Sequence, residues 1–218
     1  MSSSRRLPVY LLIDTSGSMR GEPVESVNVG LRAMQTSLRQ NPYAIETVHL
    51  SVTTFDSQIK DVLPLTALED ATIPEIVCPA SGATLLGEAL EHILDRAKKE
   101  VRQSSAEQKG DWAPLLFIMT DGKPTDTFVF NQVAPAIKAF KFGSIIACAA
   151  GPKADPAGLR LITDHVVSLD TMDSAAFTAF FQWVSVTVSS GSMSVGAANT
   201  LSLPPTPPEV NVVIERGT

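Results

Sequence analysis

A carboxylate and two hydroxyls stand at alternate positions near the start of the chain, in the turn DTSGS. Asp14, Ser16 and Ser18 directly follow the apolar run LPVYLLI (7–13). A nearly unbroken apolar run of this length is typical of a strand that is covered on both faces. Three chemistries compete for such a turn: an aspartate that is phosphorylated, a serine that acts as a nucleophile, and a metal ion that takes oxygen ligands.

Two further polar segments are expected at the same edge of a sheet. The tripeptide TDG places Asp121 at the end of the apolar run APLLFIMT (113–120), and the loop SGATLLGEAL (81–90) offers Ser81 and Thr84 near the start of a helix. Ligands of open parallel sheets collect outside the carboxyl ends of the strands. Asp14 and Asp121 should therefore face one crevice.

The phosphoaspartate and serine chemistries lack their partner groups. Phosphotransferases of the haloacid dehalogenase type use a second aspartate two residues after the first, where this chain has Ser16, and receiver domains need an acidic cluster near the chain start. The turn is not GxSxG, and the placement of the three histidines in a strand, on a helix and at a strand start suggests no proton relay. Motifs for HExxH zinc peptidases, P-loops and dinucleotide folds are also absent from the sequence.

A hard cation suits the remaining donors. Two carboxylates and three hydroxyls come from three loops: Asp14, Ser16, Ser18, Thr84 and Asp121. Mg²⁺ and Mn²⁺ prefer oxygen ligands and keep several waters, and the ligand types admit Ca²⁺ as well. If hydroxyls and water bind the ion directly while the carboxylates orient them, the ion stays electrophilic and attracts a carboxylate from outside.

Turn and cap chemistry is the alternative for each of these residues taken singly. At the third loop, Ser81 could be the ligand while Thr84 caps the helix. Around the ion, a rim that contacts a partner is expected from Met19, Arg20, Glu22, Gly82, Lys123 and Asp126. Lys123 would attract the carboxylate of a partner toward the ion. Alternatively, it is an exposed loop lysine that plays no part in partner binding.

Strand and helix patterns alternate along the chain. Strands are expected at 7–13, 48–55, 113–120, 144–150 and 165–169, with 59–65 turning back as an antiparallel hairpin partner. Helices are expected at 24–38, 85–101, 129–140 and 174–188. This alternation predicts an α/β, doubly wound, mostly parallel sheet with one antiparallel edge strand and helices on both faces.

The composition predicts one domain with a tail. The chain has 218 residues, 44% hydrophobic and 18% charged, which allows one sizeable core at 1–190. Residues 191–218 are rich in serine and glycine and then in proline, typical of a flexible linker followed by a polyproline II segment and a short β-prone end. Such a tail either docks on a partner, packs back on its own domain or stays disordered.

Charge and cysteine content limit the location and the partners. With a formal net charge of −6 and no cluster of lysine and arginine along the sequence, neither nucleic acid nor an anionic membrane is an expected partner. Cys78 and Cys148 are far apart and are expected to be free thiols in a reducing cytoplasm. The N-terminal apolar run is short and stops at Asp14, which argues against a signal peptide, and no run approaches the roughly 20 residues of a membrane helix.

Three motifs in this order resemble the metal-ion-dependent adhesion site of von Willebrand factor A domains: DTSGSM, SGATLLGEAL and IMTDGKPTD. The resemblance implies that the five oxygen ligands hold the metal and that the metal bridges to an acidic residue of a partner protein. It also implies a module that binds and does not catalyse. A metal-dependent phosphohydrolase remains an alternative and would need Glu22, Asp56 or Asp126 as a base.

A narrower resemblance is to the TerY group of bacterial tellurium-resistance proteins. It lies in RRLPVYLLIDTSGSMRGEPVESVNVGL, NPYAIETVHLSVTTFDS and LPPTPPEVNVV, and so covers essentially the whole chain. It implies a stress-response signalling or scaffolding role beside a kinase-like protein and a PP2C-type phosphatase. The cysteine-rich metal-binding region of some relatives is missing here. In a further alternative the ion has a purely structural role, in which it holds the three loops together, and the partner binds through the tail.

Overall fold

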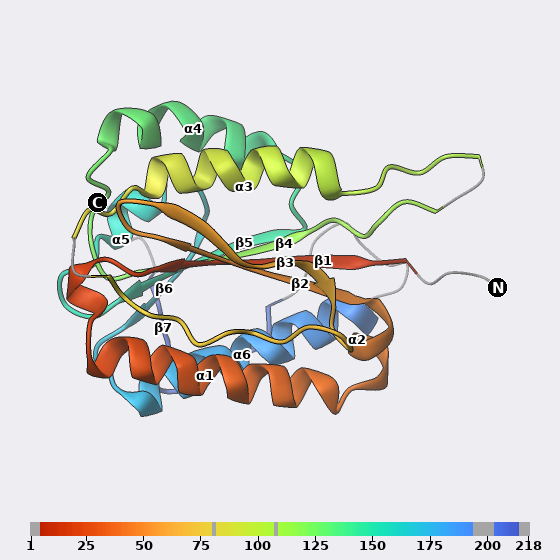
Figure 1. The fold of residues 1–218 in the computed structure, drawn as a ribbon, viewed down its shortest axis with the longest axis horizontal. Helices are drawn as coiled ribbons and strands as arrows, with labels where there is room; N and C mark the ends of the chain where they lie inside the picture. The colour runs from red at the N-terminus through yellow and green to blue at the C-terminus, as the bar shows by residue number, and fades with distance from the viewer. Residues whose placement is uncertain (1–4, 80–81, 107–108, 194–202, 214–218) are drawn as a thin grey trace.

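The computed structural model describes residues 5–79, 82–106, 109–193 and 203–213, and these form one sheet between two layers of helices (Figure 1). The strand order is β3-β2-β1-β4-β5-β6-β7. The strands are β1 (Leu7–Asp14), β2 (Val48–Phe55), β3 (Ile59–Ala67), β4 (Leu115–Thr120), β5 (Ser144–Ala150), β6 (His165–Leu169) and β7 (Asn211–Val212).

Most neighbouring strands run parallel. β1, β2, β4, β5 and β6 are paired in parallel, whereas β3 and β7 are antiparallel to their neighbours at the two edges. The predicted fold class is confirmed, and β3 is the hairpin partner expected at 59–65. The short strand β7 at the opposite edge adds a second antiparallel pair.

Four long helices cover the sheet, two on each face (Figure 1). The helical elements are η1 (Gly17–Met19, a 3-10 turn), α1 (Glu22–Arg39), α2 (Pro42–Thr47), α3 (Leu86–Glu100), α4 (Thr127–Ala139), α5 (Pro156–Leu159) and α6 (Ser174–Met193). The four predicted helices are α1, α3, α4 and α6, each with shifted ends. The short helices α2 and α5 were not predicted, because 6 and 4 residues carry no readable periodicity.

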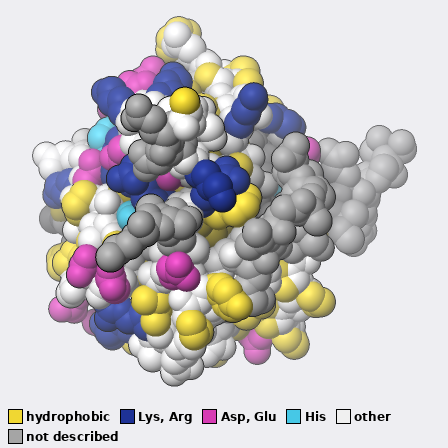
Figure 2. Space-filling view, turned by 90° about the vertical axis from the view of Figure 1, so that its right-hand side faces the viewer, with side chains coloured by type: hydrophobic (Ala, Val, Ile, Leu, Met, Phe, Trp, Pro, Cys, Tyr) yellow, Lys and Arg dark blue, Asp and Glu magenta, His cyan; other side chains and the backbone are white. Residues whose placement is uncertain are grey.

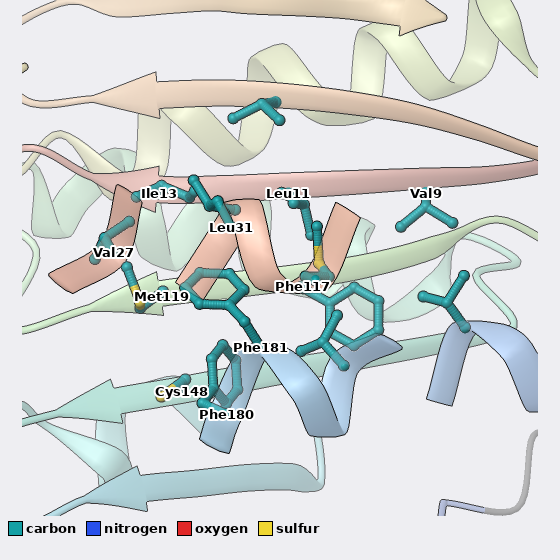
Figure 3. Packing of buried hydrophobic residues seen from close by; sticks show 14 of the residues in the cluster. Val9, Leu11, Ile13, Val27, Leu31, Phe117, Met119, Cys148, Phe180 and Phe181 are labelled. Atoms are coloured by element: carbon teal, nitrogen blue, oxygen red, sulfur yellow. The ribbon is translucent and has the colours of Figure 1, made fainter. Parts of the chain in front are cut away.

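The central strand β1 is buried along its whole length and separates two hydrophobic clusters. Val9, Leu11 and Ile13 belong to the cluster with α1 and α6, whereas Tyr10 and Leu12 belong to the cluster with α3 and α4. Successive side chains of a strand point to opposite faces, so an unbroken apolar run is what this position requires. In Figure 3, the rings of Phe180 and Phe181 point from α6 toward the strands.

The C-terminal segment returns to the domain. Trp183 Nε1 donates to the Pro204 carbonyl at 3.0 Å, and Val213 N donates to the Val166 carbonyl at 2.9 Å. Val210 is buried between these two contacts. Residues 203–213 therefore pack on their own domain. α6 runs to Met193, past the boundary expected at 190, and residues 194–202 lie outside the described chain, so the division into domain and tail stays a prediction.

Neither cysteine forms a disulfide, as expected, and Cys148 is buried in β5. Among the helices that the structure describes, none has the length and apolar character needed to cross a membrane.

Helices α1 and α6 approach closely at Gly30. A Cβ placed on Gly30 would lie 2.5 Å from Phe181 Cδ2 and 3.0 Å from the Phe177 carbonyl oxygen. We expect Gly30→Ala to lower the free energy of unfolding by about 1–3 kcal/mol through overpacking, although alanine is the better helix former. Urea denaturation measures the change. Thr36→Ala on the exposed side of α1 is the control, and a Gly30→Ala protein as stable as this control would contradict the close packing.

Candidate metal-ion site

The predicted site lies at the carboxyl ends of the central strands. Asp14 ends β1 and Thr120 ends β4, and the parallel pairing of Ile13 with Met119 brings these two ends side by side. Asp14 is 0% exposed and Asp121 3% exposed. Two carboxylates are thus held out of water at one sheet edge, an arrangement that is costly unless donors or a cation compensate it.

Two hydrogen bonds fix the Asp14 carboxylate. Oδ1 accepts from Ser16 N at 2.8 Å, and Oδ2 accepts from Thr120 Oγ1 at 2.6 Å. Burial raises the pKa of Asp14 to about 6; the bonds from Thr120 and Ser16 oppose this rise, and the negative charge of Asp121 adds to it. A cation beside this carboxylate would favour its ionised form.

The serine hydroxyls converge with Asp121. Ser16 Oγ lies 3.3 Å from Ser18 Oγ and 3.5 Å from Asp121 Oδ1. Ser16 is buried, whereas Ser18 is exposed. The cluster therefore has an inner side formed by the carboxylates and an outer side that opens to solvent through Ser18.

The loop before α3 completes the arrangement. A Cβ on Gly122 would lie 3.7 Å from Thr84 Oγ1, and a Cβ on Gly17 would lie 3.5 Å from the Gly82 Cα atom, so the three loops touch one another. Thr84 is held through its backbone, because its N–H donates to Thr125 Oγ1 at 3.1 Å and its carbonyl accepts from Thr125 N at 2.9 Å. Ser81, the alternative ligand, lies outside the described residues.

This donor set fits a hard cation. The structure brings the five predicted ligands together, and all of their donor atoms are oxygens. In the described part of the chain, no group of three or more His, Cys, Asp or Glu side chains gathers around a point. A metal here would therefore depend on the hydroxyls, and the ligand roles of the five residues stay a prediction.

The rim is smaller than expected. Arg20, Glu22, Gly82 and Lys123 are exposed, and Lys123 Nζ lies 3.9 Å from Asp155 Oδ2. Met19 was expected on the rim, but its side chain is completely buried in the cluster under α1, because the 3-10 turn directs it inward. Met19 therefore presents no surface to a partner.

Asp126 has a structural role that the sequence did not indicate. Its Oδ1 accepts from Gly87 N at 3.1 Å and its Oδ2 from Glu88 N at 2.8 Å, so the carboxylate caps the start of α3. Thus, beyond any contact at the rim, Asp126 ties the loop after β4 to α3.

A third buried carboxylate, that of Asp56, holds the loops around the site together. Asp56 Oδ2 accepts from Thr15 Oγ1 at 2.9 Å, Oδ1 accepts from Gln58 N at 3.0 Å, and the Asp56 carbonyl accepts from Leu85 N at 3.1 Å. One residue thereby joins the end of β1, the β2–β3 turn and the start of α3. Thr15, Thr120 and Thr125 support the site but carry no sequence signal, because their partners lie 41 to 106 positions away.

Cys78, in the segment that follows β3, is half-buried and packs against the hydrophobic cluster on the α1 and α6 face of the sheet. Burial, and after it the negative charges of Asp14, Asp56 and Asp121, raise the pKa of the Cys78 thiol to about 11. The thiol is therefore protonated at neutral pH.

Comparison with known proteins identifies the domain type. A sequence model of the von Willebrand factor type A domain matches residues 9–181. A search among curated proteins found no match to this sequence.

Solved structures share the fold at low sequence identity. Proximal thread matrix protein 1 from the mussel byssus is 16% identical with a TM-score of 0.63, over 86% of this chain and 49% of that one. The ArnB paralog VWA2 from Sulfolobus acidocaldarius is 18% identical with a TM-score of 0.60, over 84% and 46%. The TRAP protein of Plasmodium vivax, solved manganese-loaded, is 19% identical with a TM-score of 0.55, over 82% and 74%. This chain thus spans about half the length of the first two of these proteins.

We expect Thr120→Val to weaken divalent-metal binding by about 10–100-fold, because it removes the hydroxyl that orients the Asp14 carboxylate. Titration calorimetry with MnCl₂ measures the affinity. Thr47→Val is the control, since Thr47 is also buried and its hydroxyl bonds the Tyr43 carbonyl, far from the site. Equal affinities for the two variants would show that Thr120 does not support a metal ligand.

Proposed function

Since the chain belongs to the von Willebrand factor type A family, we propose that it is a divalent-metal-dependent protein-interaction module whose ion bridges to an acidic residue of a partner protein. The observation that carries this proposal is the meeting of Ser16, Ser18 and Asp121 beside the fixed carboxylate of Asp14. Neutral hydroxyls form the outer side of that cluster. A partner's carboxylate is the natural ligand for an ion held in this way.

Each side chain has a distinct task in the proposed site. Ser16, Ser18 and Thr84 would hold the ion through neutral oxygens, and Asp14 and Asp121 would balance its charge from the buried side. A bound Mg²⁺ or Mn²⁺ would supply the positive charge that the partner recognises. Arg20 and Lys123 are exposed near the opening and would attract an acidic surface.

We propose Mg²⁺ as the resident ion, with Mn²⁺ and Ca²⁺ as alternatives. A donor set made of oxygens alone suits Mg²⁺ and Mn²⁺, which commonly keep several of their waters. Among the similar proteins, the mussel byssus protein has also been solved with a zinc-occupied MIDAS motif, at 15% identity and a TM-score of 0.58. The donor set of this chain lacks the histidine and cysteine ligands that zinc commonly takes.

We further propose an adaptor role in a bacterial tellurium-resistance or stress-response system, in the cytoplasm. The partners would be the kinase-like protein and the PP2C-type phosphatase associated with TerY proteins. This part rests on the sequence resemblance of residues 5–31, 41–57 and 203–213 alone.

Binding is favoured over phosphate hydrolysis because two of the three candidate bases are occupied. Asp56 accepts from Thr15 and Gln58, and Asp126 caps α3. Glu22 is exposed at the start of α1. The alternative in which the tail alone binds the partner is also less favoured, since Pro204 and Val213 are hydrogen-bonded to their own domain.

The serine pair tests the metal. We expect MnCl₂ to raise the melting temperature of the wild-type chain but not of Ser16→Ala/Ser18→Ala, because ion binding at a hundredfold excess over Kd adds about 2.7 kcal/mol. The control is Ser37→Ala/Ser185→Ala, a pair with hydroxyls 3.1 Å apart, against 3.3 Å for Ser16 and Ser18. If MnCl₂ raised the melting temperature of Ser16→Ala/Ser18→Ala as much as that of the wild-type chain, the ion site would be refuted.

A pull-down tests the bridge to a partner. The chain is used as bait against a purified kinase-like protein and a purified PP2C-type phosphatase of the kind associated with TerY proteins. We expect at least one to be retained with MgCl₂, lost with EDTA, and lost with Ser16→Ala/Ser18→Ala while the circular dichroism spectrum is unchanged. Retention in EDTA would overturn the metal-bridged mode, and failure to retain either protein in MgCl₂ would overturn the proposed pathway.

A further inference from the structure

A pocket of about 500 Å³ lies at the end of the molecule where the parallel strands begin, opposite the candidate metal site. It is bounded by the segment before β1, the loop between α3 and β4, and the end of α4. The side chains that define it are Arg5, Arg102, Asp111, Trp112, Phe140 and Lys141. This size is in the range of small-molecule sites. Figure 2 faces this end and shows Lys and Arg side chains beside hydrophobic ones near its centre.

The pocket is positively charged in an acidic protein. Arg5, Arg102 and Lys141 line it, although the chain has a formal net charge of −6. The Asp111 carboxylate is neutralised, because Oδ2 accepts from Arg6 Nη2 at 2.6 Å and Oδ1 from Arg6 Nε at 2.9 Å. Three cationic residues therefore line the pocket, and among its described lining residues the one carboxylate, that of Asp111, is already paired with Arg6.

Neighbouring acidic groups do not cancel this charge. The Glu100 carboxylate accepts from Arg96 Nε at 2.9 Å and from Tyr10 Oη at 3.0 Å. Within the described ranges, neither Arg102 nor Lys141 is part of an ion pair, and both are exposed. Their charges are free to meet an incoming anion.

One wall of the pocket is already ordered. The Arg5 guanidinium stacks 3.8 Å from the centroid of the Trp112 ring, while its Nε and Nη2 donate to the Gly110 and Asp111 carbonyls at 2.7 and 3.0 Å. The two ends of the loop between α3 and β4 are joined, because Asp111 N donates to the Arg102 carbonyl at 2.9 Å. Walls fixed before binding lower the entropy loss when a ligand enters.

From these features we propose that this pocket binds a small molecule that carries phosphate and an aromatic or apolar part. Arginine and lysine together suit phosphate, since the guanidinium offers a donor fork and the ammonium a compact charge. Trp112 and Phe140 supply apolar surface for the rest of the ligand. The pocket is concave and local, unlike the extended basic stripe that tracks a nucleic-acid backbone. The proposal is independent of the metal site.

Titration calorimetry on the full chain tests the pocket, with ADP and sodium pyrophosphate as probes. EDTA is present throughout, so that no divalent ion at the opposite edge can hold the phosphates. We expect both probes to bind, with affinity that falls as NaCl is raised. We expect ADP to bind more tightly than pyrophosphate, and equal affinity for the two probes would overturn the aromatic or apolar part of the proposal.

Matched variants locate the binding. We expect Arg102→Gln/Lys141→Gln to weaken both probes about tenfold or more, because two charge-assisted contacts are lost. Lys60→Gln/Lys153→Gln removes the same charge away from the pocket and should leave the affinity unchanged. Absence of binding to the wild type, equal affinity in Arg102→Gln/Lys141→Gln, or an equal loss in Lys60→Gln/Lys153→Gln would each overturn the proposal.

Discussion

The rest of the site depends on one buried carboxylate, that of Asp14. It stands at the end of a strand that is buried along its whole length, and two short hydrogen bonds from Ser16 and Thr120 fix both of its oxygens. A carboxylate in this position is tolerated only with such donors or with a cation. The geometry of the turn follows from it, because the bond from Ser16 N bends the chain so that Ser16 Oγ approaches Ser18 and Asp121.

The acidic residues around this edge divide into two groups. Asp14 and Asp121 face the hydroxyl cluster. The carboxylate oxygens of Asp56 and Asp126 instead accept hydrogen bonds from backbone amides and from a threonine hydroxyl. The second group holds three loops at fixed positions, so the first group needs little rearrangement to meet an ion. Such preorganisation is what a site with few charged ligands requires, since neutral hydroxyls bind a cation weakly unless they are positioned in advance.

Sequence patterns predicted the parts of the molecule that depend on local signals. Apolar runs marked the five parallel strands, helical periodicity marked α1, α3, α4 and α6, and the three motifs placed their polar residues at one sheet edge. The patterns did not reveal the inward turn of Met19, the capping of α3 by Asp126, or the pairing of β7 with β6 at the sheet edge. Each of these depends on contacts between residues far apart in the sequence. The same holds for the basic pocket, because Arg5, Arg102 and Lys141 are scattered along the chain.

A crystal structure grown with MnCl₂, with anomalous differences recorded at the manganese absorption edge, tests the central claim most directly. We expect one strong anomalous peak bonded to Ser16 Oγ and Ser18 Oγ, at about 2.1–2.2 Å, close to the 2.0–2.1 Å typical of Mg²⁺. Asp14 should still accept from Thr120 in that structure, and an open ion position should face solvent or the carboxylate of a neighbouring molecule. A peak held by other residues, or no peak at this edge under saturating manganese, would contradict a metal-dependent interaction site.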